Sequence, residues 1–381
     1  MADEENAYTF TTKATRHITL GNLPEDGMHL WRGERLPEVT LAYESWGELN
    51  AAADNAIIIF TGLSPSAHAA SSAEDPSPGW WEYMIGPGKA IDTDRFFVVC
   101  ANSLGGCYGS TGPGSLNPKT GARYGADFPD VTVEDIASSG YYLMRELGVE
   151  KIHAAAGSSM GGMASIAYAM QYPGEIKYLI SISAATQALP LTIALRSLQR
   201  EIIRSDPDWN QGHYSETGRP LSGMSLARKL GLVSYRAADE WNSKFDRSRL
   251  APEKLSGKRF EREFEIENYL EYNAQKFIHS FDPNSYLYLS RAMDWFDIAE
   301  HGESISDGMS KLDVEKALVI GVTTDILFPA RQQQEIADVM RATSTDVDYI
   351  EIDSVNGHDA FLIDDEHFSP VVKHFLDETI A

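Results

Sequence analysis

The chain has 381 residues, 43% of them hydrophobic and 10% aromatic, which is enough for a sizeable core in one enlarged domain. Its formal net charge of −24 argues against a nucleic-acid partner, which needs a basic surface, and against binding to anionic membranes. No basic segment followed by an apolar one opens the sequence and no run of about eighteen apolar residues occurs, so neither a secretory signal nor a transmembrane helix is predicted.

Short apolar segments rich in β-branched residues predict buried strands in the first half of the chain and again near its end. Amphipathic segments between them predict helices. Strands that are apolar without alternation are typical of a parallel sheet with helices on both faces, so we expect an α/β fold with a mostly parallel, doubly wound sheet. The strands are Ile57–Phe60, Phe96–Cys100, His153–Ala156, Leu179–Ser183, Leu318–Val322 and Tyr349–Ile352, and the helices include Thr132–Leu147 and Ala164–Gln171.

The alternation of strands and helices stops after Ser183 and returns near residue 310. Between these points the sequence predicts helices with charged faces, for example Ile193–Arg204, Leu226–Leu230 and Tyr269–Ser280. A core sheet interrupted by helices indicates a lid over the active site. We therefore expect a catalytic core formed by residues 1–183 and 310–381, and a helical lid formed by residues 184–309.

The segment Gly-Ser-Ser-Met-Gly at 157–161 matches the pattern G-x-S-x-G around Ser159. It follows a predicted strand and precedes a predicted helix, which is the setting of the nucleophile elbow of α/β hydrolases. Glycines are needed there because backbones approach closely in a sharp strand-to-helix turn. The pattern predicts an α/β-hydrolase fold with Ser159 as the nucleophile.

A serine nucleophile needs a histidine base and a carboxylate, which follow it along the chain in this fold. Asp325 lies just beyond one late predicted strand, and His358 lies beyond the next, after a glycine. We expect His358 to deprotonate Ser159 and Asp325 to orient the imidazole. An oxyanion hole needs two backbone N–H groups, and we expect Met160 and Leu63 to provide them.

Several blocks in order along the chain resemble the homoserine O-acyltransferase family of α/β-hydrolase acyltransferases. The resemblance extends from about residue 41 to residue 375, in the blocks TGLSPSAH, PGWWEYMIGPGKAIDTDRFFVV, NSLGGCYGSTGP, GSSMGGM, TTDILFP and NGHDAF. It implies an acyl-CoA co-substrate without a permanently bound cofactor, and a ping-pong reaction in which a small amino acid accepts the acyl group on its hydroxyl. It also implies a homodimer formed through lid helices.

By the same resemblance, Arg228 and Asp359 match residues that contact the amino-acid substrate. An amino acid presents one carboxylate and one ammonium group, so an arginine and an aspartate suit it. The loop Pro65, Ser66, Ala67 and His68 stands where members that use homoserine carry a different sequence, and it is similar to the branch that acylates L-serine for cysteine synthesis.

Arg196 stands where homoserine acetyltransferases carry asparagine, and a guanidinium there suits the free carboxylate of a succinyl group. We therefore favour succinyl-CoA as donor and L-serine as acceptor. Leu327 departs from this pattern, because succinyl-using homoserine enzymes tend to carry arginine at that position. Homoserine or serine O-acetyltransfer, with acetyl-CoA as donor, is the alternative, together with homoserine O-succinyltransfer.

Other classes of protein share parts of these patterns. A plain esterase would use the same triad with water as acceptor, and an inactive binding protein would lack a triad member. No P-loop or dinucleotide motif follows a strand, and Cys100 and Cys107 lie far from any metal-ligand set, so no metal site is predicted. A cytoplasmic enzyme acting on small molecules agrees with all of these features.

Overall fold

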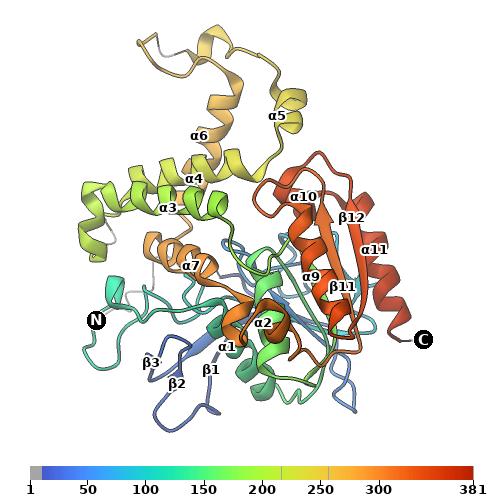
Figure 1. Ribbon diagram of the computed structural model, residues 1–381. Coiled ribbons are helices and arrows are strands. Elements are labelled where there is room, and N and C mark those ends of the chain that lie inside the picture. The colour runs from blue at the N-terminus through green and yellow to red at the C-terminus, as the bar shows by residue number, and fades with distance from the viewer. Residues whose placement is uncertain (1–10, 216, 256, 381) are drawn as a thin grey trace.

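A computed structural model describes residues 11–215, 217–255 and 257–380, and it is built around one eight-stranded sheet (Figure 1). Residues 1–10, where the sequence predicts no secretory signal, lie outside the described residues. The spatial order of the strands is β1-β4-β8-β5-β9-β10-β11-β12. Their bounds are β1 Arg16–Thr19, β4 Thr40–Trp46, β5 Ala56–Phe60, β8 Phe97–Ala101, β9 Ile152–Ser158, β10 Ile176–Ile182, β11 Lys316–Val322 and β12 Asp346–Ile352.

The strands from β8 to β12 in this order run parallel to their neighbours, whereas β4 pairs antiparallel with both β1 and β8. The parallel part is therefore extended at one edge by two antiparallel strands. Two small sheets lie outside it. They are β2 (Met28–His29) with β3 (Arg35–Leu36), and β6 (Ile85–Gly86) with β7 (Ile91–Asp92).

Both faces of the sheet are buried. In β5, Ile58 and Phe60 pack into one apolar core while Ile57 and Ile59 pack into the other, as the two-residue period of a strand requires. The first core is closed by helices α1 (Val133–Glu146), α2 (Met160–Gln171) and α9 (Ala330–Ala342). The second is closed by α11 (Asp365–Glu378) and by residues 69–96. This is the α/β-hydrolase fold that the sequence predicts.

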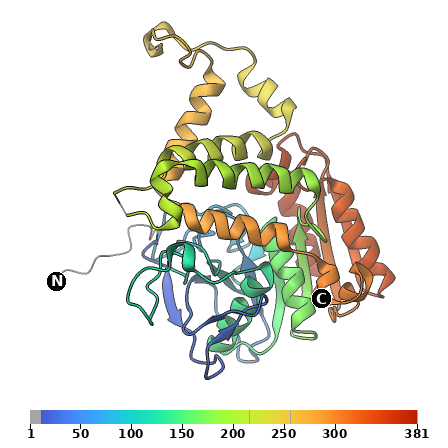
Figure 2. The ribbon, with the colours of Figure 1, turned by 60° about the vertical axis from the view of Figure 1, so that its left-hand side comes forward.

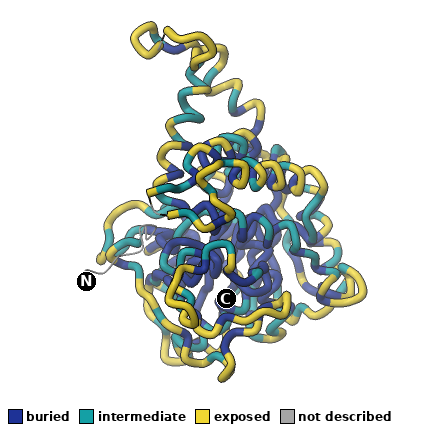
Figure 3. Tube along the Cα trace, turned by 90° about the vertical axis from the view of Figure 1, so that its left-hand side faces the viewer, coloured by how far each residue is buried: buried dark blue, intermediate teal, exposed yellow. Residues whose placement is uncertain are grey.

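A group of helices leaves the sheet after β10 and the chain returns to it at β11. In Figures 1 and 2, α3 and α4 lie side by side above the carboxyl ends of the strands, with α7 beneath α3. Helices α5 and α6 extend away from the body, and Figure 3 shows that this arm is largely exposed. The bounds are α3 Pro190–Ser205, α4 Leu221–Tyr235, α5 Ala238–Phe245, α6 Glu265–Ile278, α7 Pro283–Trp295 and α8 Ile305–Met309. The domain boundaries at 183 and 310 remain a prediction.

The sequence analysis did not predict the two antiparallel strands, β1 and β4. Strand β4, with the sequence TLAYESW, carries the buried Glu44 and therefore lacks the apolar run that predicts a buried strand. No helix in the part of the chain that the structure describes is long and apolar enough to cross a membrane.

Candidate active site

Ser159 lies in a sharp turn between β9 and α2, at the carboxyl end of the sheet. Its backbone has φ 57° and ψ −121°, a conformation that side-chain-bearing residues rarely adopt outside functional sites. A Cβ at Gly157 would lie 2.1 Å from the carbonyl oxygen of Gly161, and one at Gly161 would lie 2.1 Å from that of Phe60. The two glycines of the motif are thus required by contact with neighbouring backbone.

Three buried side chains form a hydrogen-bonded chain at this turn. His358 Nε2 lies 2.9 Å from Ser159 Oγ, and His358 Nδ1 lies 2.6 Å from Asp325 Oδ2. With Nδ1–H donating to the carboxylate, Nε2 is free to accept the proton of the hydroxyl. The structure therefore brings together the three residues for which the sequence predicts catalysis.

The loops that carry Asp325 and His358 hold each other in place. Asp325 Oδ1 accepts hydrogen bonds from the backbone N–H of Leu327 at 2.8 Å and of Phe328 at 2.9 Å, which leaves Oδ2 for the imidazole. Thr324 Oγ1 accepts from the N–H of Gly357 at 3.1 Å. Both carboxylate oxygens and both loops are therefore fixed before any substrate binds.

The pKa of His358 lies above its usual value of 6.5. Burial alone would lower it, but the charge and hydrogen bond of Asp325, with the charge of Asp359, more than offset burial. The positive charge of Arg196 acts in the opposite direction and lowers it. An imidazole with a raised pKa is a stronger base toward the serine hydroxyl.

The backbone N–H groups of Leu63 and Met160 are the expected oxyanion donors. Leu63 lines the same cavity as Ser159 and His358, and Met160 is the first residue of α2. Among the described residues, neither N–H donates a hydrogen bond, which for Met160 is expected in the first turn of a helix. Two unpaired donors beside the nucleophile suit an oxygen that gains negative charge.

A cavity of about 90 Å³ opens over Ser159 between the sheet and the lid helices. Arg196 lines it, and its Nε donates to Asp294 Oδ1 at 2.6 Å. Its Nη2 is buried and has no hydrogen-bond partner among the described residues. Because an unpaired buried donor is costly, a guanidinium left this way beside a cavity suits a ligand carboxylate.

Asp359 also lines the cavity, but it already has a partner that the sequence analysis missed. Arg236 Nε lies 3.1 Å from Asp359 Oδ2 and its Nη1 donates to Glu240 Oε1 at 2.6 Å. Burial raises the pKa of Asp359, while the charges of Arg236, His358 and Arg228 lower it, and burial prevails. The signal for Arg236 was weak, because an arginine at a helix end is usually solvated.

Arg228 stands behind the cavity rather than in its lining. Its guanidinium lies 4.3 Å from the ring centre of Phe277 and 5.8 Å from that of Tyr235, which does line the cavity. Its Nε is buried without a hydrogen-bond partner in the described chain. Arg228 thus lies beside a residue of the cavity wall, and its contact with a substrate remains a prediction.

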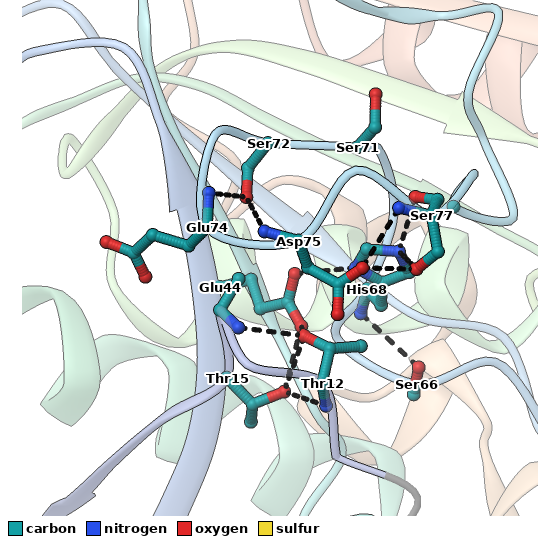
Figure 4. Close-up of polar contacts among 12 residues, drawn as sticks. Thr12, Thr15, Glu44, Ser66, His68, Ser71, Ser72, Glu74, Asp75 and Ser77 are labelled. Carbon is teal, nitrogen blue, oxygen red and sulfur yellow. Dashed lines mark hydrogen bonds and ion pairs between the residues drawn. The ribbon is translucent and has the colours of Figure 1, made fainter.

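The predicted specificity loop is divided between the cavity and the protein interior. Pro65 lines the cavity, the Ser66 carbonyl accepts from Trp80 Nε1 at 2.8 Å, and Ala67 is buried. His68 points away, with Nδ1 2.8 Å from Glu44 Oε2 and Nε2 2.9 Å from the Ser77 carbonyl (Figure 4). The structure thus gives His68 no place in the cavity wall.

Glu44, whose carboxylate is hydrogen-bonded to His68, also binds two threonines at the start of the described chain. Its Oε1 accepts from Thr12 Oγ1 at 2.6 Å and from Thr15 Oγ1 at 2.8 Å (Figure 4). Burial lowers the pKa of His68, but the hydrogen bond and charge of Glu44 prevail and raise it. The histidine therefore contributes to packing of the loop rather than to the surface a substrate would meet.

The fold and the Ser, His and Asp arrangement define the class as that of the α/β hydrolases. A family model described as α/β hydrolase fold matches residues 55–363. Crystal structures of a homoserine O-acetyltransferase from Bacillus anthracis and of esterase E22 superpose with TM-scores of 0.86 and 0.85 and identities of 29% and 30%. The first covers 95% of this chain and 97% of that one, and the second covers 95% and 99%.

Sequence comparison narrows this class. The serine O-succinyltransferase of Litchfieldella anticariensis is 54% identical over 350 residues, which are 92% of this chain and 95% of that protein. The chain therefore belongs to the family of serine O-succinyltransferases, which are acyltransferases with the α/β-hydrolase fold. The resemblance predicted from the sequence motifs is confirmed.

Proposed function

We propose that the chain transfers a succinyl group from succinyl-CoA to the hydroxyl of L-serine, through an ester on Ser159. The observation that carries this proposal is the buried Nη2 of Arg196, unpaired among the described residues, in the cavity that holds Ser159 and His358. The relative in Litchfieldella anticariensis, which is named serine O-succinyltransferase, supports the succinyl group and the serine acceptor.

In the first half-reaction, His358 Nε2 takes the proton of Ser159 while Oγ attacks the thioester carbonyl. The N–H groups of Leu63 and Met160 stabilise the oxyanion, and Asp325 stabilises the imidazolium. The C–S bond then breaks, and His358 returns its proton to the CoA thiolate. CoA leaves as the free thiol and the acyl group remains on Ser159.

In the second half-reaction, His358 deprotonates the hydroxyl of L-serine, which attacks the acyl ester. Collapse of the second tetrahedral intermediate breaks the bond to Ser159 Oγ, and His358 returns the proton to that oxygen. Asp359 binds the ammonium group, and Arg228 attracts the carboxylate. The neighbouring Arg236 holds Asp359 Oδ2 at 3.1 Å, so we expect Oδ1 to face the ammonium.

Homoserine O-acetyltransfer is the second candidate. It is favoured by the similarity to the Bacillus anthracis structure and by Leu327, an apolar residue of the cavity wall, where arginine would be expected in a succinyl-using homoserine enzyme. The identity of 29% to that structure is well below the 54% to the Litchfieldella relative. We therefore favour L-serine as the acceptor and succinyl-CoA as the donor.

We propose further that the protein forms a homodimer and that it is located in the cytoplasm. Acyl-CoA donors are made inside the cell. Large apolar side chains are exposed on the lid and its arm, where a second copy would cover them, namely Leu226, Val233, Leu255, Phe260 and Tyr272. Sedimentation of the purified protein tests this, because a monomer at micromolar concentration would contradict it.

The substrate assignment is tested by measuring free-thiol release with succinyl-CoA and acetyl-CoA, each against L-serine and L-homoserine. We expect fast release only with succinyl-CoA and L-serine. Fast release only with acetyl-CoA and L-homoserine would support the second candidate. Equal release without any amino acid would instead indicate hydrolysis, the activity named for esterase E22.

A further inference from the structure

Three arginines stand in a row along α3. Arg196, Arg200 and Arg204 are spaced four residues apart, so they share one face of the helix. Arg196 begins the row in the wall of the Ser159 cavity. At 1.5 Å rise per residue, Arg204 lies about 12 Å further along the helix axis.

The row leads into a second cavity, of about 370 Å³, between α3 and α7. Figure 2 shows the two helices side by side, and Arg200 Nη1 donates to Ser290 Oγ of α7 at 2.9 Å. Arg200 and Arg204 line this cavity from α3, and Arg291 lines it from α7. None of its lining residues is acidic, in a chain whose formal net charge is −24.

Two of these arginines have acidic partners and one has none. Arg200 Nη2 lies 2.6 Å from Asp294 Oδ2, a carboxylate it shares with Arg196, and Arg291 pairs with Asp130. Arg204, which is exposed, contacts only the Arg200 carbonyl, at 3.4 Å, and pairs with no carboxylate of the described residues. The cavity is thus lined by three arginines, while Asp294 and Asp130 lie outside the lining, so every charged side chain that lines it is cationic.

Two aromatic side chains complete the lining. Trp209 is held by a hydrogen bond from Nε1 to Asn284 Oδ1 at 3.0 Å. The Tyr288 hydroxyl donates to the Ala126 carbonyl at 2.8 Å, and the Arg291 guanidinium lies 5.1 Å from the Tyr288 ring centre. Fixed aromatic faces between arginines suit a nucleotide, because bases stack on such rings while guanidinium groups pair with phosphates.

We propose that this cavity between α3 and α7 binds the adenine and phosphate groups of the acyl-CoA donor. The inference rests on the proposed function, which requires a CoA thioester at Ser159. Such a thioester carries its acyl group and its phosphates at opposite ends of an extended pantetheine arm. The small cavity holds the acyl end, the larger one holds the nucleotide, and the arm follows the row of arginines between them.

Arg204 is the residue at which to test the proposal, because replacing Arg200 would also disturb Asp294 and Arg196. Transfer is measured with succinyl-CoA and with the succinyl thioester of N-acetylcysteamine, which lacks the nucleotide. In Arg204→Ala, the ratio of kcat/KM for the two donors should fall at least tenfold, and Arg204→Lys should restore part of it. Arg249→Ala, at an exposed arginine of the arm, should keep the wild-type ratio.

The wild-type ratio retained in Arg204→Ala would overturn the inference, as would a wild-type enzyme that does not prefer succinyl-CoA. Calorimetry on the wild-type protein needs no variant, and CoA bound no more tightly than pantetheine would also overturn it. If neither thioester supports transfer, the proposed function fails. Tighter binding of CoA by the wild type than by Arg204→Ala would then still support the nucleotide site, and equal binding would reject it.

Discussion

The turn at Ser159 and the lid above it differ in how far their polar groups are already hydrogen-bonded. At the turn, a Cβ added to either motif glycine would lie 2.1 Å from a backbone oxygen, and every polar atom of Asp325 and His358 that serves the reaction is already paired. In the lid, Arg196 and Arg228 each keep a buried nitrogen without a partner in the described chain. The catalytic triad is thus fully hydrogen-bonded without substrate, whereas these two lid arginines are not, and we expect the core to carry the reaction and the lid to select the reactants.

The largest contrast should come from two serines that line the same cavity, one from each region. Ser159→Ala should lower thiol release by about 10⁴-fold or more, because the nucleophile is lost. Ser234→Ala should lower it by less than about tenfold, since Ser234 Oγ donates to the Gly231 carbonyl of its own helix. Similar losses in both variants would contradict the division between core and lid.

Replacing a glycine by alanine should lower the free energy of unfolding more at the turn than in the lid. In Gly161→Ala the new Cβ would meet the Phe60 carbonyl oxygen at 2.1 Å, so the free energy of unfolding should fall by about 1–3 kcal/mol or more. In Gly218→Ala of the lid the nearest atom is the side-chain Oγ of Ser215 at 3.1 Å rather than backbone, and the change should stay within about 0.5 kcal/mol. Urea unfolding measures the free energy of unfolding of both variants. An unchanged value in Gly161→Ala would contradict the close backbone contact at the turn.

Arg196→Asn should separate donor choice from catalysis. The loss of a charged hydrogen bond costs about 1.5–3 kcal/mol, so kcat/KM with succinyl-CoA should fall about ten- to a hundredfold. With acetyl-CoA, which has no free carboxylate, the fall should be smaller by at least tenfold. Equal losses on both donors would remove Arg196 from the recognition of succinate.

The smallest expected effect is a shift in the pH dependence of acylation when Arg196 of the lid is replaced, because its charge acts on His358 of the core. Acylation needs neutral His358, so its rate should fall as the pH drops through a pKa above 6.5. Arg196 lowers this pKa by its charge, so Arg196→Asn should raise the pKa and move the acidic limb to higher pH. Single-turnover thiol release at a series of pH values measures it, and a shift to lower pH would contradict this coupling.

The contrast between regions also explains what the sequence could predict. Ser159, Asp325 and His358 follow strands and glycines within a few residues, so local patterns locate them. Arg196 depends on Asp294, 98 positions away, and Asp359 depends on Arg236, 123 positions away. No local pattern encodes these pairs, because folding alone brings them together.

The fold shows the same limit. The inner parallel strands β5, β9 and β11 were predicted because both of their faces are buried and their sequences are apolar. Strands β1 and β4 were not, because one lies at the edge of the sheet and the other buries a glutamate. His68 was assigned to the specificity loop by its place in the sequence, whereas the structure pairs it with that same glutamate.

In the proposed reaction, Ser159 carries the acyl group between donor and acceptor. This role is tested most directly by incubating the enzyme with succinyl-CoA alone and locating the adduct by peptide mass spectrometry. We expect a succinyl ester on Ser159 that disappears when L-serine is added, with O-succinylserine released. An adduct absent from Ser159, or one that L-serine does not discharge, would contradict this role.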